Sequence, residues 1–334
     1  ILPWRTTSDA YHIWVSEIML QQTQIAAVIE YFKRFMTELP TVESLAQCPD
    51  DHLLKLWEGL GYYSRVRNMK KAAIFLMENG FSEIPADYDV IRNMPGVGPY
   101  TAGAISSMAF DLPHPAVDGN VLRVMSRLTG DDQDVMDPKV RKAREQAIRT
   151  FFEENPQVSP GAFNEALMEL GETVCIPHGE AKCKTCPLAD YCTAFKNDLV
   201  DQLPVRIVKT KRRIEKKTIF LLEQDGKILL NKRPGTGLLA GLYEFPNIEG
   251  HLDETEVGKY LSDQGLDVIN AIPLKKAKHL FSHIEWQMIG YKVAVKQGEK
   301  IADAPEGCLW VELSDLKNAY AVPSAFDAYK KYLI

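Results

Sequence analysis

Four cysteines lie within eighteen residues, in the run CIPHGEAKCKTCPLADYC, and thiols at this density bind metals or form disulfides. Only two other cysteines occur in the 334-residue chain, which excludes the disulfide framework of a small secreted protein. Four thiolates would suit tetrahedral zinc, but zinc sites usually join two C-x2-C pairs across a longer loop. Here single cysteines flank one such pair, which favours an iron–sulfur cluster and leaves zinc as the alternative. The candidate ligands are Cys175, Cys183, Cys186 and Cys192.

Two further stretches carry residue types that could do chemistry. The segment MPGVGPYTAGAI holds Gly96 and Gly98 between two short helical patterns, and glycines there let backbone N–H groups approach a phosphate closely. Glu17 lies in WVSEIMLQQTQ among strongly apolar neighbours. A carboxyl group in apolar surroundings has a raised pKa, which suits a general acid. The alternative for the glycine segment is an ordinary turn, and the alternative for Glu17 is an exposed acid on a helix.

The elements that must position these residues change character along the chain. Apolar residues recur at spacings of three and four up to about residue 198, which predicts helices. From Lys217 onward the segments alternate and are rich in β-branched residues, which predicts strands. Between them, the strip from Arg206 to Lys217 carries seven cations and one acid. This composition suits either a solvated linker or a segment that contacts phosphate. We expect domains at 1–198 and 217–334 joined by a basic linker at 199–216.

Composition narrows the class of protein. The chain is 46% hydrophobic and 25% charged, as in ordinary globular proteins, and its length suits two domains. Its apolar runs are too short and too interrupted for a transmembrane span, and no signal peptide is visible. The chain begins at Ile1 rather than methionine, which indicates a lost natural start. A net charge of -6 argues against a uniformly basic DNA-coating protein but permits a DNA enzyme with a local basic strip.

The cysteine loop, together with MPGVGPYTA and AVDGNV in that order, resembles the endonuclease III superfamily of helix-hairpin-helix DNA glycosylases. Seven residues separate Cys175 and Cys183, where the family usually has six. Superfamily members that also cleave the strand carry a hairpin lysine, whereas this chain has Pro99 and Tyr100 there. The words SEIMLQQT and LPWR narrow the resemblance to the adenine glycosylases of the MutY family. The fold expected is an all-α glycosylase domain with a 4Fe-4S loop, followed by an α+β Nudix-like domain.

The resemblance implies a division of work between two acids. Glu17 would protonate the adenine that leaves, and Asp118 would stabilise or capture the positive sugar. Tyr100 would lie at the reacting sugar, and Asn120 would help to position it and the water. Without its context, Asp118 reads more simply as the N-cap of the helix that follows.

The same resemblance implies how the base is reached and read. A base must be extruded from the duplex before it can enter a pocket, and the gap must be filled. Without the family context, GLGYYSR reads as a helix end with core aromatics, and Trp4 as a core tryptophan. The implied DNA-contacting residues are Gln22, Thr23, Leu60, Tyr62, Gly96 and Gly98, and those of the adenine pocket are Trp4, Arg5 and Glu165.

The second domain resembles the Nudix-like C-terminal domain of the same family. Its helical stretch VGKYLSDQGLD lacks the clustered glutamates that bind Mg²⁺ in Nudix hydrolases, so nucleotide hydrolysis is not expected. Phe281, Ser282 and His283 match the family's loop that reads 8-oxoguanine. The alternative for this triplet is a polar turn.

The resemblance therefore predicts a monofunctional glycosylase that removes adenine opposite 8-oxoguanine or guanine in base excision repair. It implies double-stranded DNA carrying these mispairs as the partner, a sliding clamp as a further candidate partner, a monomer, and a bacterial cytoplasmic, nucleoid-associated location. Two rivals remain. One is a bifunctional lyase of endonuclease III type, and the other is a catalytically silent binder of damaged DNA.

Overall fold

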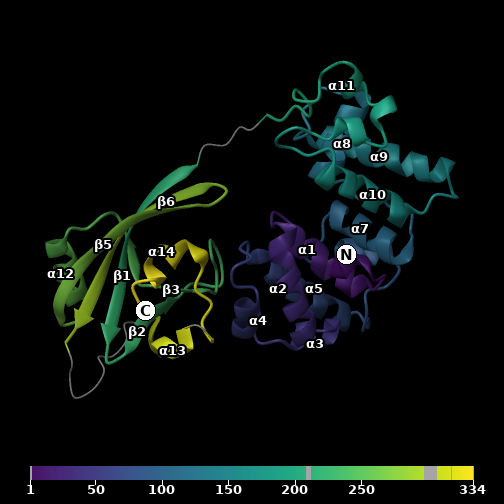
Figure 1. The fold of residues 1–334 in the computed structure, drawn as a ribbon. Helices are drawn as coiled ribbons and strands as arrows, with labels where there is room; N and C mark the ends of the chain where they lie inside the picture. The colour runs from purple at the N-terminus through teal and green to yellow at the C-terminus, as the bar shows by residue number, and fades with distance from the viewer. Residues whose placement is uncertain (1, 208–211, 297–306, 317, 334) are drawn as a thin grey trace. The chain divides into compact units, whose positions relative to one another are not determined.

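The computed structural model describes residues 2–207, 212–296, 307–316 and 318–333. Its contacts divide the chain into two units (Figure 1). Unit 1 comprises residues 1–48 and 67–208, and unit 2 comprises residues 49–66 and 209–334. Val208–Lys211, in the basic strip, lie outside the described residues. No helix within the described ranges is long and apolar enough to cross a membrane.

Unit 1 is helical. Several of its helices begin at a polar residue that accepts backbone N–H bonds; Asp9, for example, accepts from the N–H groups of Tyr11 and His12. Its elements are η1 (Pro3–Arg5), α1 (Ala10–Leu20), α2 (Ile25–Glu38), α3 (Val42–Gln47), most of α5 (Ser64–Glu78), α6 (Tyr88–Asn93), α7 (Pro99–Phe110), α8 (Gly119–Thr129), α9 (Pro138–Glu154), α10 (Pro160–Thr173), η2 (Cys183–Thr185), η3 (Ala189–Tyr191) and α11 (Thr193–Lys196).

Helices α7 and α10 of unit 1 pack tightly against the segment that leads to Asp118. Gly103 of α7 lies so close to this segment that an added Cβ would come within 2.0 Å of the Pro115 carbonyl oxygen. The fully buried Asn164 of α10 accepts a hydrogen bond from the Ala116 N–H at 3.1 Å and donates one to the His114 carbonyl at 2.9 Å. Close packing and a buried amide therefore fix the backbone just ahead of Asp118.

Unit 2 is built on one mixed sheet with the strand order β3-β2-β1-β6-β5. β1 and β6 run parallel, whereas β4 pairs with β1, and β7 with β2, in antiparallel fashion. The elements are α4 (Asp50–Leu56), β1 (Arg213–Gln224), β2 (Lys227–Lys232), β3 (Tyr243–Glu244), β4 (Asn247–Glu249), α12 (Glu254–Asp263), β5 (Val268–Leu280), β6 (Ile284–Val295), β7 (Cys308–Glu312), α13 (Leu313–Leu316), η4 (Ser324–Phe326) and α14 (Asp327–Lys330).

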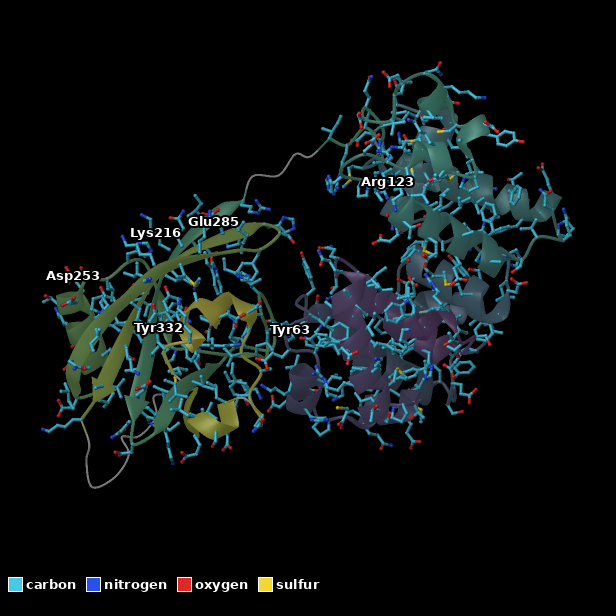
Figure 2. The ribbon with its side chains drawn as sticks, in the orientation of Figure 1. Tyr63, Arg123, Lys216, Asp253, Glu285 and Tyr332 are labelled. Atoms are coloured by element: carbon cyan, nitrogen blue, oxygen red, sulfur yellow. The ribbon has the colours of Figure 1, made fainter. Side chains whose placement is uncertain are left out.

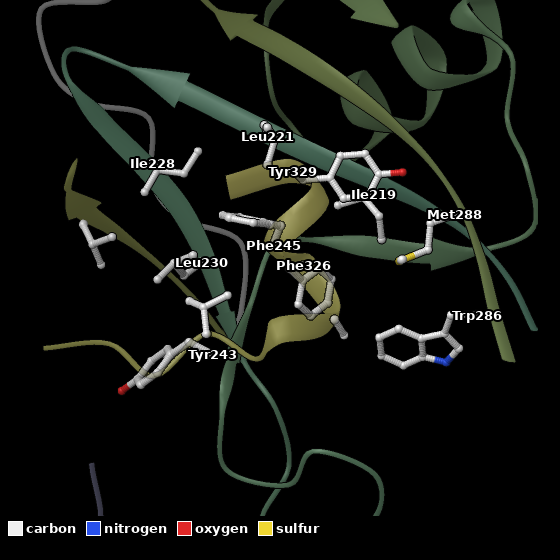
Figure 3. Packing of buried hydrophobic residues seen from close by; sticks show 13 residues of the cluster. Ile219, Leu221, Ile228, Leu230, Tyr243, Phe245, Trp286, Met288, Phe326 and Tyr329 are labelled. Carbon is white, nitrogen blue, oxygen red and sulfur yellow. The ribbon is translucent and has the colours of Figure 1, made fainter. Parts of the chain in front are cut away.

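Each face of this sheet carries its own apolar core, because successive side chains of a strand point to opposite faces. On β1, Ile219 and Leu221 join Trp286 and Phe326 on one face, as Figure 3 shows. Phe220 of β1 packs with Val257 and Leu261 of α12 on the other. A sheet covered on both sides, after a helical unit, confirms the fold class expected from the sequence.

Candidate functional site

A cavity of about 540 Å³ in unit 1 brings together the two acids singled out in the sequence. Glu17 reaches it from α1, Tyr100 from the first turn of α7, and Asp118 from the residue before α8. None of the residues that the structure shows lining this cavity is a lysine. The remaining lining residues are Arg5, Leu20, Gln21, Gln22, Thr23, Ile25, Gly119, Asn120, Arg141, Met168, Glu169 and Glu172.

Glu17 is almost completely buried, with 3% of its surface exposed. The Tyr100 hydroxyl donates a 2.5 Å hydrogen bond to Oε2 of Glu17, and Arg5 Nη1 lies 3.8 Å from Oε1. Burial raises the pKa of Glu17, while the Tyr100 hydrogen bond and the Arg5 charge oppose the rise only in part. A negative Asp118 adds to the rise. Glu17 therefore retains a proton to higher pH than an exposed glutamate, as a general acid requires.

Asp118 holds its carboxylate with two hydrogen bonds. Its Oδ1 accepts from the Val121 N–H at 2.8 Å, which caps α8, and its Oδ2 accepts from Asn120 Nδ2 at 3.0 Å. Burial raises the pKa of Asp118, and these hydrogen bonds oppose the rise because they favour the charged form. The N-cap expected from the sequence is confirmed, and the same side chain also faces the cavity. The two interpretations of Asp118 therefore coexist.

A chain of hydrogen bonds continues from Asp118 towards the cysteine loop. Arg123 Nη2 donates to Asn120 Oδ1 at 2.8 Å and to the Gly171 carbonyl at 2.7 Å, and its Nε donates to the Cys175 carbonyl at 2.7 Å. Arg123 is only 6% exposed and is labelled in Figure 2. Nothing in the sequence marks this arginine as functional except its place one helical turn after Asn120 in NVLRV.

Arg5 joins three glutamates at the cavity wall. Besides Glu17, its Nε lies 2.8 Å from Oε1 of Glu165 and 3.4 Å from Oε1 of Glu169. Glu165 does not line the cavity itself, but its pairing with Arg5 places it next to the site. Trp4 is 1% exposed and packs edge-on against Phe32, which is the core position considered as its alternative.

The hairpin glycines lie as the motif predicts. Gly96 adopts φ +79°, and a Cβ there would come within 2.6 Å of Asn68 Cβ, so a side chain is excluded twice over. Gly98 is the N-cap of α7 with open space around its Cα, and Pro99 occupies the first helical turn. The helix N-terminus after Gly98 therefore presents unpaired N–H groups, the arrangement that binds a phosphate.

The four cysteines of the loop line one small apolar pocket together with Arg127. Arg127 Nη1 donates to Cys175 Sγ at 3.3 Å, and Cys192 Sγ donates to the Arg127 carbonyl at 3.4 Å. Burial and the neighbouring thiols Cys175 and Cys192 raise the pKa of Cys183. Among the described residues, no set of three or more His, Cys, Asp or Glu side chains could hold a metal ion. The four thiols nevertheless line one pocket beside a guanidinium, and by type they are the donors of a thiolate-bound group.

Unit 2 brings the aromatic GLGYY segment and the Phe281–His283 triplet together. Tyr62 is 48% exposed, and its hydroxyl lies 3.3 Å from Ser282 Oγ. Phe281 is half-buried against Trp286, with ring centroids 4.9 Å apart, so it anchors the turn between β5 and β6. Ser282 and His283 are exposed at the tip. Leu60, by contrast, is only 6% exposed.

Comparison with known proteins agrees with this geometry. Residues 15–150 match the model of the HhH-GPD superfamily base excision DNA repair proteins, and residues 218–332 match that of the NUDIX domain. The chain is 32% identical to the adenine DNA glycosylase of Mus musculus over 99% of this chain and 75% of that protein. It is 30% identical to the adenine DNA glycosylase of Buchnera aphidicola subsp. Schizaphis graminum over 96% and 90%.

Among solved structures, that of a thermostable thymine-DNA glycosylase superposes with a TM-score of 0.53 and 26% sequence identity. The superposition covers 59% of this chain and 89% of that one. A helix-hairpin-helix repair domain joined to a Nudix-like domain, with relatives that match along almost the whole chain, settles the family. The chain belongs to the adenine DNA glycosylases, the DNA N-glycosylases that remove adenine in base excision repair.

Proposed function

We propose that this enzyme removes adenine opposite 8-oxoguanine or guanine by acid-assisted hydrolysis of the N-glycosidic bond, without cleaving the strand. The observation that carries the proposal is one cavity that holds a buried, proton-retaining Glu17 and a hydrogen-bonded Asp118. Burial raises the pKa of both carboxyl groups, but the hydrogen bonds from Val121 and Asn120 favour the charged form of Asp118, so we assign the acid to Glu17 and the anion to Asp118. The lack of a lysine among the cavity residues supports a monofunctional reaction, because a lyase step needs an amine nucleophile.

In the proposed mechanism, the flipped adenine enters the cavity and Glu17 donates its proton to a ring nitrogen. Adenine then leaves as a neutral base, and the C–N bond electrons go with it. Asp118 stabilises the positive sugar, and water adds to the sugar carbon and releases a proton. Tyr100 orients the Glu17 carboxyl through its 2.5 Å hydrogen bond, and Asn120 fixes the Asp118 carboxylate. Arg5 holds Glu165 and Glu169 at the wall where the base would lie.

DNA recognition is assigned to residues around this cavity and in unit 2. Gln22 and Thr23 line the cavity and would probe the duplex at the extrusion site. Tyr62 would enter the gap that the flipped adenine leaves, and the N–H groups after Gly96 and Gly98 would hold a phosphate. Leu60 is only 6% exposed and would support the loop that carries Tyr62 from within.

Replacing Gly171 by alanine tests how closely Asn120 and Asp118 must be held. A Cβ at residue 171 would lie 2.6 Å from Asn120 Cβ, so Asn120 must shift. We expect the single-turnover excision rate to fall about tenfold or more, because misplacement by a fraction of an ångström weakens transition-state contacts. Gly258→Ala in α12, where the added Cβ meets nothing within 4 Å, is the matched control. Equal rates in both variants would contradict the positioning of Asp118 through this packing.

The exposed Ser282 and His283 are assigned to the base opposite the adenine. A hydroxyl and an imidazole can hydrogen-bond the altered edge of an oxidised purine. We expect Ser282→Ala with His283→Ala to lower the preference for 8-oxoguanine over guanine about tenfold, the worth of one or two hydrogen bonds, while excision opposite guanine changes little. The check is the ratio of single-turnover rates on the two duplexes at limiting enzyme. An unchanged ratio would reduce this triplet to a turn.

The cysteine loop is assigned to a 4Fe-4S cluster held by Cys175, Cys183, Cys186 and Cys192. The four thiols converge beside Arg127, whose positive charge would offset that of an anionic cluster. The group would tie the loop to α8 and so support Arg123 and Asn120. We expect purified protein to be brown, with a broad visible absorbance and about four irons per chain. Colourless protein with one zinc per chain would show that the four cysteines bind zinc instead.

A further inference from the structure

Residues 49–66 belong by their contacts to unit 2, although they stand between segments of unit 1 in the sequence. Two side chains near the end of α4 join this segment to the C-terminal stretch of the chain. Lys55 Nζ donates to the Tyr320 carbonyl at 3.1 Å and to the Leu316 carbonyl at 3.4 Å. Its third contact is Oε2 of Glu58 at 2.5 Å.

Glu58 is the centre of this attachment. Its Oε1 accepts a hydrogen bond from the Val322 N–H at 3.1 Å and lies 3.4 Å from Lys330 Nζ. Lys330 Nζ also donates to the Val322 carbonyl at 2.6 Å, so the carboxylate and the lysine together bind the backbone N–H and C=O of Val322. The side chains of Lys55, Glu58 and Lys330 are 17%, 23% and 28% exposed. Partly buried charge-assisted bonds of this kind are stronger than surface ion pairs.

The loop from Trp57 to Tyr63, which contains Glu58 and Tyr62, is braced by its own hydrogen bonds. Trp57 Nε1 donates to the Gly61 carbonyl at 3.0 Å, and Arg65 Nη2 donates to the Leu60 and Gly61 carbonyls at 2.9 and 3.1 Å. Tyr62 itself has φ +46°, a left-handed conformation that a bulky residue adopts only where its surroundings enforce it. The loop therefore transmits the position of Glu58 to the Tyr62 side chain.

At the far end of this loop, the Tyr62 hydroxyl meets Ser282 Oγ at 3.3 Å. Two parts of unit 2 thus meet at this contact. One is the series of contacts from Val322 and Lys330 through Glu58 to Tyr62, and the other is the turn between β5 and β6 that carries Ser282. The hydrogen bond between Tyr62 and Ser282 forms only if both of these parts keep their positions.

We propose that Glu58 is a positioning residue for recognition of the lesion. It anchors the Trp57–Tyr63 loop to the Val322–Lys330 segment, so that Tyr62 and Ser282 present a single preassembled surface to the base opposite the adenine. This inference rests on the proposed function, because it assigns Ser282 to that base. Glu58 touches neither DNA nor Glu17 in this assignment, and it acts through Tyr62.

The test uses the full chain with Glu58→Gln, which keeps the shape and a carbonyl acceptor for Val322 but removes the charge that binds Lys55 and Lys330. The readout is the preference, defined as the ratio of second-order single-turnover rate constants for adenine opposite 8-oxoguanine and opposite guanine. We expect a fall of about five- to thirtyfold, which lies within the energetic coupling of contacting groups. Lys330→Gln removes the same ion pair from the other side and should lower the preference in the same direction.

Asp51→Asn is the matched control. Asp51 lies in the same segment and forms an ion pair with Lys232 at 2.8 Å, but both side chains are about half exposed at 46% and 45%. Exposed pairs contribute little, and this one is separated from the loop by the length of α4. The Asp51→Asn variant should show the same preference for 8-oxoguanine over guanine as the parent protein. Melting temperatures measured for all variants separate a loss of folding from a loss of preference.

A double mutant shows whether Glu58 acts through Tyr62. Tyr62→Phe removes the hydroxyl that meets Ser282, so adding Glu58→Gln to it should lower the preference no further. If the double mutant lowers the preference by the product of the two single effects, or if Glu58→Gln leaves the preference unchanged, the inference is overturned while the proposed specificity stays intact. If the parent protein shows no preference for 8-oxoguanine, the proposed specificity and the role of Glu58 both fail. Faster hydrogen exchange at residues 59–63 in Glu58→Gln is the expected structural counterpart, and unchanged exchange there would also contradict the inference.

Discussion

Replacing Glu17 by glutamine should abolish adenine excision while leaving DNA binding intact. Glutamine preserves the volume and an acceptor for the Tyr100 hydroxyl, but it cannot donate a proton to the leaving base. General acid catalysis contributes about 10²- to 10⁴-fold, so we expect the single-turnover rate to fall by at least about 10³-fold. The affinity for the mispair duplex, measured by fluorescence anisotropy, should match that of the parent protein. Retained turnover would remove Glu17 from the mechanism.

The pH dependence gives the same prediction a second readout. Burial raises the pKa of Glu17, so its acid form persists above the range of an exposed glutamate and is lost as pH rises through the raised value. The excision rate of the parent protein should therefore fall on the alkaline side, and the residual rate of Glu17→Gln should not follow that fall. Glu83→Gln, at an exposed position of unit 1, is the control for a general effect of losing one charge.

Replacing Asp118 by asparagine should have the second large effect. Asparagine caps helices as well as aspartate does, so the hydrogen bond to the Val121 N–H and the start of α8 should survive. The negative charge against the sugar is lost, and removal of one electrostatic contact in a transition state costs about 10²- to 10³-fold in rate. The measurement is single-turnover excision with saturating enzyme, together with the melting temperature.

Asp118→Ala completes the comparison, because it removes both the charge and the cap. We expect the alanine variant to lose as much activity as the asparagine variant and to melt at a lower temperature, since an N-cap contributes about 1 kcal/mol to the stability of the protein. An asparagine variant as active as the parent, beside an inactive alanine variant, would show that Asp118 serves only as a cap.

The sequence was most informative where chemistry restricts residue type. The motif predicted glycine at residue 96, and the structure gives the reason, because its φ is positive and Asn68 fills the space of a side chain. The apolar neighbours of Glu17 likewise predicted its burial, which the structure bears out at 3% exposure. The change from helical spacing to alternation at Lys217 predicted the second fold class, and β1 indeed begins nearby at Arg213.

Features that depend on tertiary contacts could not be predicted in this way. Arg123 is an ordinary helix cation in the sequence, and only folding brings Asn120, Gly171 and Cys175 within its reach. The first domain expected from the sequence, 1–198, likewise includes residues 49–66, whereas their contacts place them with unit 2. Trp4 could have been a pocket wall or a core residue, because an aromatic ring suits both, and its packing on Phe32 makes it a core residue.

The most direct test is single-turnover excision on duplexes that carry adenine opposite 8-oxoguanine, guanine or thymine, each quenched with and without hot alkali. We expect breaks at adenine opposite 8-oxoguanine and guanine only, and only after alkali, because the proposed reaction releases the base and leaves the strand whole. Breaks without alkali would contradict a monofunctional reaction and support a lyase. No breaks with any duplex would contradict the catalytic roles of Glu17 and Asp118.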